Sequence, residues 1–445
     1  MAFTFTPLNQ SWIEPASEFV NSQFPEAVAT LGKLVKIPGI AWESFDSNNL
    51  DRSAAAVAAE LEALQMFDTV EIRRSAKPDG ELGAPAIVAR RAGASDAPHV
   101  LLYAHHDVQP PGARELWKTE PFEATLVGDR LFGRGASDDK SGIITHLYSL
   151  KTLKKLASSL RLGITVFIEG EEEAGSESFP NFLRENQADL EADLIIVADS
   201  GNWSEDVPAL TTSLRAMVSQ TFTIRTLDHA VHSGLYGGPL PDATGAMIKL
   251  LATLTDEQGN VAIAGLDSIP VDGPDLSDAE FGVAAGLLPG VKRLGTKSAT
   301  QQIWGEPAVT VIGMDIPQVD VSSNTAQPES RARISLRLAP SQDPDTGLEL
   351  LRQHISAHAP EGAVVEFGRS EKGPGYLAKN GWAAPMAHEA FGIAWPNPSV
   401  NIGIGGSIPF ISEFAERFPN AEILVTGVEE PDSRAHSPNE SQHLP

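Results

Sequence analysis

Short apolar runs alternate with amphipathic helical patterns over much of the chain. Segments such as Ser141–Leu156 place apolar residues on one face at helical spacing. The runs between such segments are continuously apolar, as strands buried on both faces of a sheet require: Val100–Ala104, Ile164–Ile168, Leu194–Ala198 and Ile423–Thr426. This strand–helix alternation predicts an α/β domain built on a mostly parallel sheet.

The pattern changes in the middle of the chain. Apolar and polar residues alternate there, as in antiparallel strands with one exposed face, and a Gly- and Pro-rich stretch from Asp256 to Pro307 interrupts them. Because the last parallel-type strand follows this block, the sequence predicts that an α+β domain is inserted into the first domain. We expect residues 1–213 and 376–445 to form the first domain and residues 214–375 the inserted one.

The composition narrows the possible functions. The 445 residues include 33 Lys and Arg against 59 Asp and Glu, a net charge of −26, and such a field repels the phosphates of nucleic acids. The sequence has no Cys, which excludes disulfides, thiolate metal sites and cysteine nucleophiles. The N-terminus lacks a secretory pattern and no stretch approaches the length of a membrane span, so we expect a cytoplasmic protein that does not bind membranes.

Potential metal ligands follow the four apolar runs. In open α/β sheets the carboxyl ends of the strands border the ligand crevice, so side chains at these ends are expected to converge. A further carboxylate stands where a Gly-rich turn enters the Ser141–Leu156 helix. In chain order the candidates are His105, Asp138, Glu172 with Glu173, Asp199 and His436.

Histidine and carboxylate ligands without thiolate suit zinc, manganese or cobalt. Two His and three carboxylates exceed the three protein ligands of a single catalytic zinc, so the sequence predicts two divalent ions about 3.5 Å apart. One carboxylate of the Glu run is left to transfer protons. Each signal alone has an ordinary explanation, such as a core histidine, a solvated Glu cluster or a helix cap. Their joint occurrence at strand ends favours a metal site.

These residues lie in motifs that resemble one known family, the dinuclear zinc peptidases that include carnosinase, aminoacylase and carboxypeptidase G. The carnosinase-like dipeptidase branch is the most similar. The motifs follow in family order over roughly residues 30–440: YAHHDVQP, ELWKTEPFEATLVGDRLFGRGASDDKSG, EGEEEAGSESF, VADSGN, DHAVHSGLYGG, WGEPAVTVIG, NIGIGGSIP and AHSPNE.

The resemblance implies a role for each ligand. His105 and Asp199 would bind one zinc ion, and Glu173 and His436 would bind the other. Asp138 would bridge the two ions.

The resemblance also implies two catalytic carboxylates. Glu172 would be the general base that activates a water between the metals and then protonates the leaving amine. Asp107 would hydrogen-bond the free ring nitrogen of His105 and so fix its tautomer.

The family fold implied is a zinc domain interrupted by a lid domain through which the chain forms a homodimer. His232 would reach across the dimer to stabilise the oxyanion in the partner's site. Asn324 and Arg337 would contact the substrate's carbonyl and carboxylate, and Ser407 would lie in the loop around the same end. From the residues alone, Arg337 also fits an ordinary charge on a strand face, and Ser407 fits a turn residue.

One position departs from the family pattern. The branch usually has Arg-Glu before GGSIP, whereas this chain has Gly403-Ile404. Without that arginine, we expect a substrate that is less anionic or that is held chiefly by Arg337.

The sequence thus predicts a metal-dependent dipeptidase acting on small unblocked peptides with a free C-terminal carboxylate. An aminoacylase or deacylase acting on N-acyl amino acids is the alternative, because the amide hydrolysis is the same. Glu-Pro-Phe at 120–122 and Trp304 are carnosinase-type features and favour the dipeptidase. An inactive binding or scaffold protein is the third possibility, and it would require a lost ligand or a replaced Glu172, neither of which the sequence shows.

Overall fold

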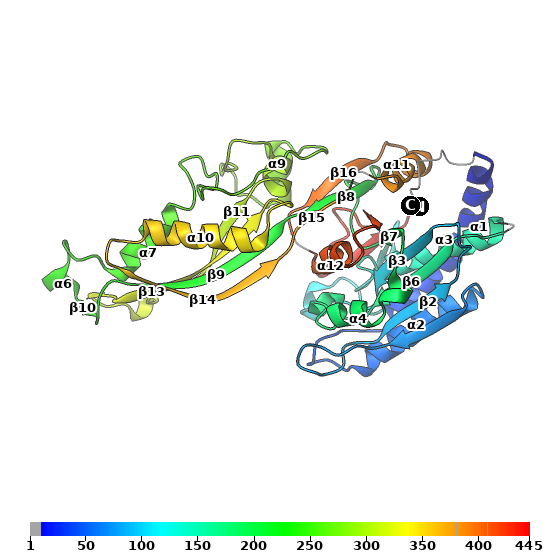
Figure 1. Cartoon of the computed structure of the whole chain (residues 1–445), viewed down its shortest axis with the longest axis horizontal. Coiled ribbons are helices and arrows are strands. Elements are labelled where there is room, and N and C mark those ends of the chain that lie inside the picture. The colour runs from blue at the N-terminus through cyan, green and yellow to red at the C-terminus, as the bar shows by residue number, and fades with distance from the viewer. Residues whose placement is uncertain (1–9, 158, 380, 407) are drawn as a thin grey trace. The chain divides into compact units, whose positions relative to one another are not determined.

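The structure is a computed structural model that describes residues 10–157, 159–379, 381–406 and 408–445 (Figure 1). The chain forms two compact units. Unit 1 contains the residues up to Thr211 together with Ala378–Asn401 and Glu413–Pro445, and unit 2 contains Thr212–Leu377 and Ile402–Ser412. The changes of unit at 211–212 and 377–378 fall close to the expected domain boundaries. Residues 402–412 join unit 2, although the sequence analysis assigned them to the first domain.

Unit 1 is an α/β unit. Its elements are α1 (Gln10–Val35), α2 (Asn48–Ala63), β1 (Thr69–Arg73), β2 (Ala86–Arg91), β3 (His99–His105), η1 (Arg114–Leu116), β4 (Thr125–Val127), β5 (Arg130–Phe132), α3 (Lys140–Leu156), β6 (Gly163–Glu169), η2 (Glu172–Ala174), α4 (Phe179–Glu185), α5 (Gln187–Leu190), β7 (Leu194–Val197), α11 (Ala383–Ala394), β17 (Glu422–Val425) and β18 (Ser441–His443). Three elements span a change of unit: β8 (Ala209–Leu214), β16 (Val400–Ile404) and α12 (Pro409–Arg417).

The main sheet of unit 1 has the strand order β1-β2-β6-β3-β7-β17. The four strands predicted from the apolar runs are neighbours and pair in parallel, and β2 and β1 extend the sheet in antiparallel fashion. This arrangement confirms the predicted mostly parallel α/β fold. It also brings the carboxyl ends of β6, β3, β7 and β17 to one edge of the sheet.

Two hydrophobic layers hold that sheet in place. Leu102 and Ala104 of β3 face one layer, which includes the apolar sides of α1, α2 and α3. Tyr103 faces the other layer, and its ring centroid lies 5.6 Å from those of both Phe167 and Phe414. Because β3 is packed on both faces, the residue at its carboxyl end, His105, has little freedom to move.

Unit 2 is built on an antiparallel sheet of order β11-β13-β9-β14. Even-numbered residues of β9 and β13, such as Val218 and Leu336, face a core shared with α7 and α10, which lie along the sheet (Figure 1). Odd-numbered residues therefore lie on the opposite face. The elements are β9 (Ala216–Arg225), β10 (Val231–His232), α6 (Ser233–Tyr236), α7 (Ala243–Ala252), α8 (Asp278–Ala284), α9 (Ala299–Trp304), β11 (Ala308–Asp315), η3 (Val319–Val321), β12 (Thr325–Ala326), β13 (Glu329–Leu338), α10 (Pro344–His358), β14 (Val364–Gly373) and β15 (Tyr376–Leu377).

Among the described residues, no helix combines the length and the apolar character that a membrane crossing needs.

Candidate metal centre

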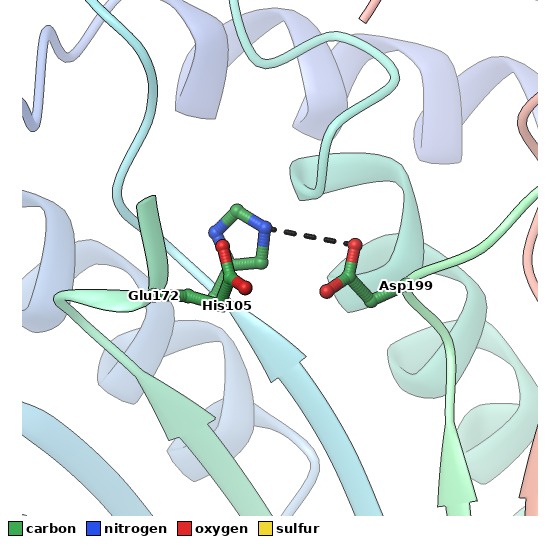
Figure 2. Close-up of side chains that lie close together, drawn as sticks. All are labelled: His105, Glu172 and Asp199. Carbon is green, nitrogen blue, oxygen red and sulfur yellow. Dashed lines mark ion pairs between the residues drawn. The ribbon is translucent and has the colours of Figure 1, made fainter. Parts of the chain in front are cut away.

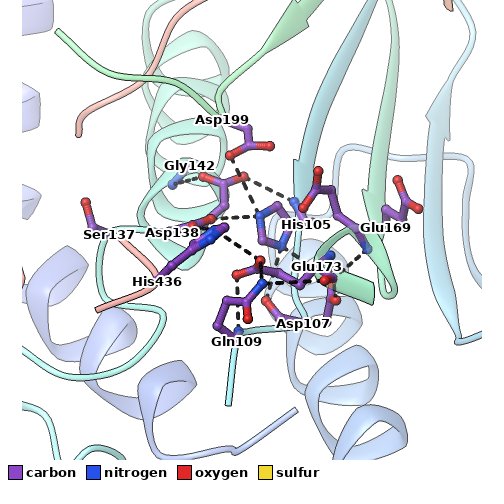
Figure 3. Close-up of polar contacts among 12 residues, drawn as sticks. His105, Asp107, Gln109, Ser137, Asp138, Gly142, Glu169, Glu173, Asp199 and His436 are labelled. Carbon is purple, nitrogen blue, oxygen red and sulfur yellow. Dashed lines mark hydrogen bonds and ion pairs between the residues drawn. The ribbon is translucent and has the colours of Figure 1, made fainter. Parts of the chain in front are cut away.

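The five predicted ligands lie together at the carboxyl edge of the unit 1 sheet (Figure 3). Each one comes from a different segment of the chain, so the sheet topology is what assembles them. His105 ends β3, Asp138 precedes α3, Glu173 lies in η2 after β6, Asp199 follows β7, and His436 lies on the loop after β17.

Asp138 lies between the two imidazoles. Its Oδ1 is 3.0 Å from Nε2 of His105, and its Oδ2 is 3.0 Å from Nε2 of His436. One carboxylate thus presents one oxygen to each histidine. This is the arrangement expected of a carboxylate that bridges two cations.

The remaining donors form two groups around Asp138. In the first, donor atoms of His105, Glu172 and Asp199 all lie within 4.8 Å of one another (Figure 2). The second group joins Asp138 to Glu173 and His436 within the same limit. Nε2 of His105 is 3.7 Å from Asp199 Oδ1, so the expected pairing of these two ligands is geometrically possible.

The donor set fits divalent cations. Four carboxylates and only two imidazoles share the edge, so the cluster lacks positive charge. Hydrogen bonds to Asp138 and Glu173 raise the pKa of His436 to about 11. Burial lowers the pKa of His105, but the charge of Asp199 and the contacts to Asp107 and Asp138 together outweigh burial and bring that pKa well above its usual value. Bound cations would supply the missing charge and release these protons.

Asp107 is fully buried and organises two parts of the site. Its carboxylate accepts hydrogen bonds from the backbone N–H groups of Glu172 and Glu173, at 3.1 Å each. Nδ1 of His105 lies 3.1 Å from the Asp107 carbonyl oxygen and 3.4 Å from its carboxylate. Asp107 therefore orients both the His105 ring and the start of η2, and the second of these contacts was not predicted.

The three consecutive glutamates have different surroundings. Glu171 faces away from the ligands, where its carboxylate accepts hydrogen bonds from the backbone N–H groups of Ala84 and Ser178. Glu172 lies beside the first ligand group, and burial together with the charge of Asp199 raises the pKa of Glu172 well above its ordinary value. A carboxyl group with a raised pKa holds a proton more readily than an ordinary one, as a group that takes up and then donates a proton must.

Comparison with known proteins identifies the family. Residues 101–444 match peptidase family M20/M25/M40. The chain belongs to this family. It is therefore a peptidase, as the motifs predicted, and the matched segment includes all five ligand positions.

The M20 chain also resembles individual proteins along nearly its whole length. It is 32% identical over 447 residues to the cysteinylglycine-S-conjugate dipeptidase of Corynebacterium striatum, covering 99% of this chain and 93% of the relative. It is 25% identical to the Beta-Ala-His dipeptidase of Rattus norvegicus over 79% of this chain and 75% of the relative. The structure of human carnosine dipeptidase 1 has the same fold, with a TM-score of 0.72, 21% identity, and coverage of 99% of this chain and 96% of that one.

Three further predicted residues of the M20 chain, His232, Asn324 and Arg337, belong to unit 2. His232 and Asn324 are exposed neighbours in unit 2, where β10 pairs with β12 and the N–H of Ser233 donates to the Asn324 carbonyl at 2.9 Å. Arg337 is half-buried on β13 of the same unit. Ser407 lies outside the described residues. The roles of these four residues remain predictions.

Residues that the sequence analysis did not select also shape the centre. Nε2 of Gln109 donates to Glu173 Oε2 at 2.6 Å. The carboxylate of Asp139 accepts from the His105 N–H at 3.1 Å and caps α3 through Gly142. The peptide between Asp138 and Asp139 is cis. Gln109 and Asp139 both belong to the quoted motifs, so membership of those motifs was the sequence signal that could have identified them.

Glu440 holds the backbone at Asp138 in place through hydrogen bonds. Its Oε1 accepts hydrogen bonds from the backbone N–H groups of Ser137, at 3.0 Å, and Asp138, at 3.1 Å. Its Oε2 pairs with the guanidinium of Arg134 at 2.5 Å, and both side chains are almost fully buried. The Arg134 guanidinium in turn lies 5.4 Å from the centre of the Trp117 ring. Glu440 thus fixes the backbone from which the central carboxylate projects.

We therefore expect Glu440→Gln to weaken metal binding by about 10- to 100-fold, because it loosens the support of a ligand. It should also lower the free energy of unfolding of the metal-free protein by about 3–5 kcal/mol, since Arg134 is left as an unpaired buried charge. Competition with a chelator measures the first effect, and denaturant unfolding measures the second.

Glu120→Gln is the matched control, because it breaks the exposed ion pair with Arg114 and should cost less than about 1 kcal/mol. The double variant Arg134→Met/Glu440→Met should recover part of the stability but not the metal affinity. Wild-type metal affinity in Glu440→Gln would contradict this account.

Proposed function

We propose that this chain is a metal-dependent dipeptidase that hydrolyses the amide bond of small unblocked peptides with a free C-terminal carboxylate. The observation that carries the proposal is the Asp138 carboxylate facing both imidazoles, with Glu172 beside them. The names of the relatives in Corynebacterium striatum and Rattus norvegicus, both dipeptidases, support the same activity.

Two divalent ions would be held by His105, Asp138, Glu173, Asp199 and His436. We expect zinc, with manganese or cobalt as alternatives, because the ligands are imidazoles and carboxylates. When bound, such ions polarise a carbonyl group and lower the pKa of a water to near neutrality.

The protein's own groups would handle the proton. Glu172 would take it from the attacking water and donate it to the leaving amine, which matches the raised pKa of that carboxyl group. Asp107 would keep Nε2 of His105 directed at the ligand cluster, since the other ring nitrogen faces Asp107. Arg337, Asn324 and the loop containing Ser407 would bind the carboxylate end of the peptide.

An aminoacylase or deacylase would use the same amide hydrolysis. The reported relatives do not favour it, because their names describe dipeptidases.

We also propose that the chain acts as a homodimer through the unit 2 domain. Large apolar side chains just after His232 in the chain are exposed: Leu235 is 76% exposed and Tyr236 is 57% exposed. A second copy would cover these side chains and bring the partner subunit's His232 to the reacting carbonyl. The cytoplasmic location expected from the N-terminal sequence stays a prediction.

The first test is a substrate panel. We expect hydrolysis of Ala-Ala, Cys-Gly or β-Ala-His to exceed hydrolysis of N-acetylated amino acids, and exhaustive chelation to abolish turnover until zinc or manganese is added back. Amino acid release and metal content per chain are the measurements. Undiminished activity in chelated protein with no measurable metal would reject the proposal, and a preference for N-acetylated substrates would select the alternative.

The second test concerns the proton carrier. Glu172→Gln should lower kcat by about 100- to 10,000-fold, because general acid–base assistance is lost while the ligands remain. Metal analysis should find the same content as in the wild type. Glu177→Gln, an exposed change on the same segment, is the control and should leave kcat unchanged. Turnover at the wild-type rate by Glu172→Gln would show that Glu172 is not the general base.

The third test concerns the dimer. Glu172→Gln and His232→Ala should each be nearly inactive, yet mixing them under conditions that exchange subunits should restore activity, since a mixed dimer contains one site with both residues intact. Activity is measured before and after mixing, and sedimentation gives the oligomeric state. A monomer, or a mixture no more active than its components, would refute the shared site.

A further inference from the structure

Arg215 is a buried cation without a carboxylate partner. It is the residue between β8 and β9, and only 8% of its surface is exposed. Its guanidinium donates to three backbone carbonyls, those of Gly405 at 3.0 Å and of Gln302 and Glu306 at 3.3 Å each. Burying a guanidinium is costly, and carbonyl oxygens offset its charge only in part.

Other arginines of β9 and β13 are neutralised by acids. Arg225 pairs with Glu329, Arg331 with Asp315, and Arg333 with Glu371. Neither Arg215 nor Arg337 has an ion pair within the described residues, and the remaining positions of the sequence contain no Asp or Glu. Among the described residues, Arg215 is the only buried arginine without an ion pair, since Arg134, the other buried one, pairs with Glu440.

Arg215 and Arg337 lie close to one another at the end of the unit 2 sheet where β9 begins. Arg337 of β13 pairs in register with Met217 of β9, and Arg215 lies two residues before Met217. They are therefore diagonal neighbours, a relationship that spans about 7–8 Å between strands and is within reach of long side chains. Burial and the charge of Arg337 lower the pKa of Arg215 to about 10, so the Arg215 guanidinium is still charged at neutral pH and is repelled by Arg337.

The loop after β16 explains why a guanidinium comes from Arg215. A Cβ atom at Gly403 would lie 2.6 Å from Cγ of Trp304 and 2.7 Å from Oγ of Ser213, so no larger residue fits there. Gly403 lies near the end of β16, so a side chain as large as arginine is sterically excluded at this position. Arg215 reaches the same loop from the strand side, where its Nη2 would lie 3.0 Å from a Cβ atom at Gly405.

We propose that Arg215 and Arg337 together form the carboxylate-binding site of unit 2, with Arg215 the residue that makes the enzyme specific for peptides with a free C-terminal carboxylate. The inference rests on the proposed function, since the ligand is taken to be the substrate. A carboxylate has two acceptor oxygens and one negative charge, which complement two guanidinium groups that lack acids of their own. A neutral C-terminal amide would leave both charges uncompensated.

The experiment compares Ala-Ala with Ala-Ala amide as substrates of the metal-loaded enzyme. The wild type should prefer the acid, and Arg215→Met should lower kcat/KM for the acid by about 100-fold, chiefly through KM. The amide should change by less than about 3-fold, so that the preference collapses. Arg215→Lys should be intermediate, because it keeps the charge but loses the planar fork.

Arg333→Met is the matched control, since Arg333 lies on the same strand and face as Arg337 but is paired with Glu371. It should preserve the preference for the acid. A purely structural role for Arg215 predicts equal losses on acid and amide, and that result would overturn the proposal. If Arg215→Met does not fold, Arg215→Gln takes its place, because glutamine can still donate to the Gly405 carbonyl.

Calorimetric titration separates this inference from the proposed function. In a Glu172→Gln background, Ala-Ala should bind more tightly than its amide, and adding Arg215→Met should remove the difference. A wild type that cleaves neither peptide would reject the dipeptidase proposal while this titration still tests the site. Equal dissociation constants for acid and amide with Arg215 present would refute the assignment.

Discussion

The metal centre depends on one electrostatic constraint: four carboxylates share a sheet edge with two imidazoles. Like charges at this spacing repel strongly in a partly buried site, so the edge keeps its geometry only where each carboxylate is held by opposing groups. Asp138 faces His105 and His436, and its backbone is anchored by Glu440, which is itself neutralised by Arg134. The contacts thus run from the Arg134 guanidinium through the Glu440 carboxylate to the backbone N–H of Asp138, whose own carboxylate faces the imidazoles. Cations at the cluster would supply the positive charge that its carboxylates lack.

Much of this arrangement was predictable, because local patterns of apolar and polar residues indicate it. The continuous apolar runs identified β3, β6, β7 and β17, and the residues after them supplied the candidate ligands, since parallel strands must end at one edge. Glu440 was not predictable by the same reasoning. Its partners are the backbone N–H groups of Ser137 and Asp138 and the side chain of Arg134, all of which lie about 300 positions earlier in the chain. No periodicity of the sequence indicates contacts over such a separation. Apart from its place at the end of the AHSPNE motif, nothing in the sequence distinguishes Glu440 from a solvated carboxylate.

Arg215 shows a second limit of sequence reasoning. A single arginine between two strands is not part of any periodic pattern. Arg215 is notable because no carboxylate pairs with it among the described residues. Only the three-dimensional structure shows that its acceptors are carbonyls and that the acids of neighbouring strands are used by other arginines. The structure also explains why a glycine stands at position 403, since Trp304 and Ser213 occupy the space that a side chain would need. Packing decided which position supplies a guanidinium to this loop.

A chain with a net charge of −26 should repel an anionic ligand at long range, yet a free carboxylate is the group that two unpaired arginines would bind. The two statements are compatible because salt screens exposed charges beyond about 8 Å, whereas partly buried groups act over shorter distances with little screening. A dipeptide is also a zwitterion, so its ammonium group offsets the long-range repulsion while its carboxylate is recognised at contact. Leaving Arg215 without an acid therefore costs some stability of unit 2, and its charge would then be available to a ligand. The acidic surface acts at long range, whereas the unpaired arginines act at contact distance. Selectivity for the C-terminal carboxylate would come from the contacts with the arginines.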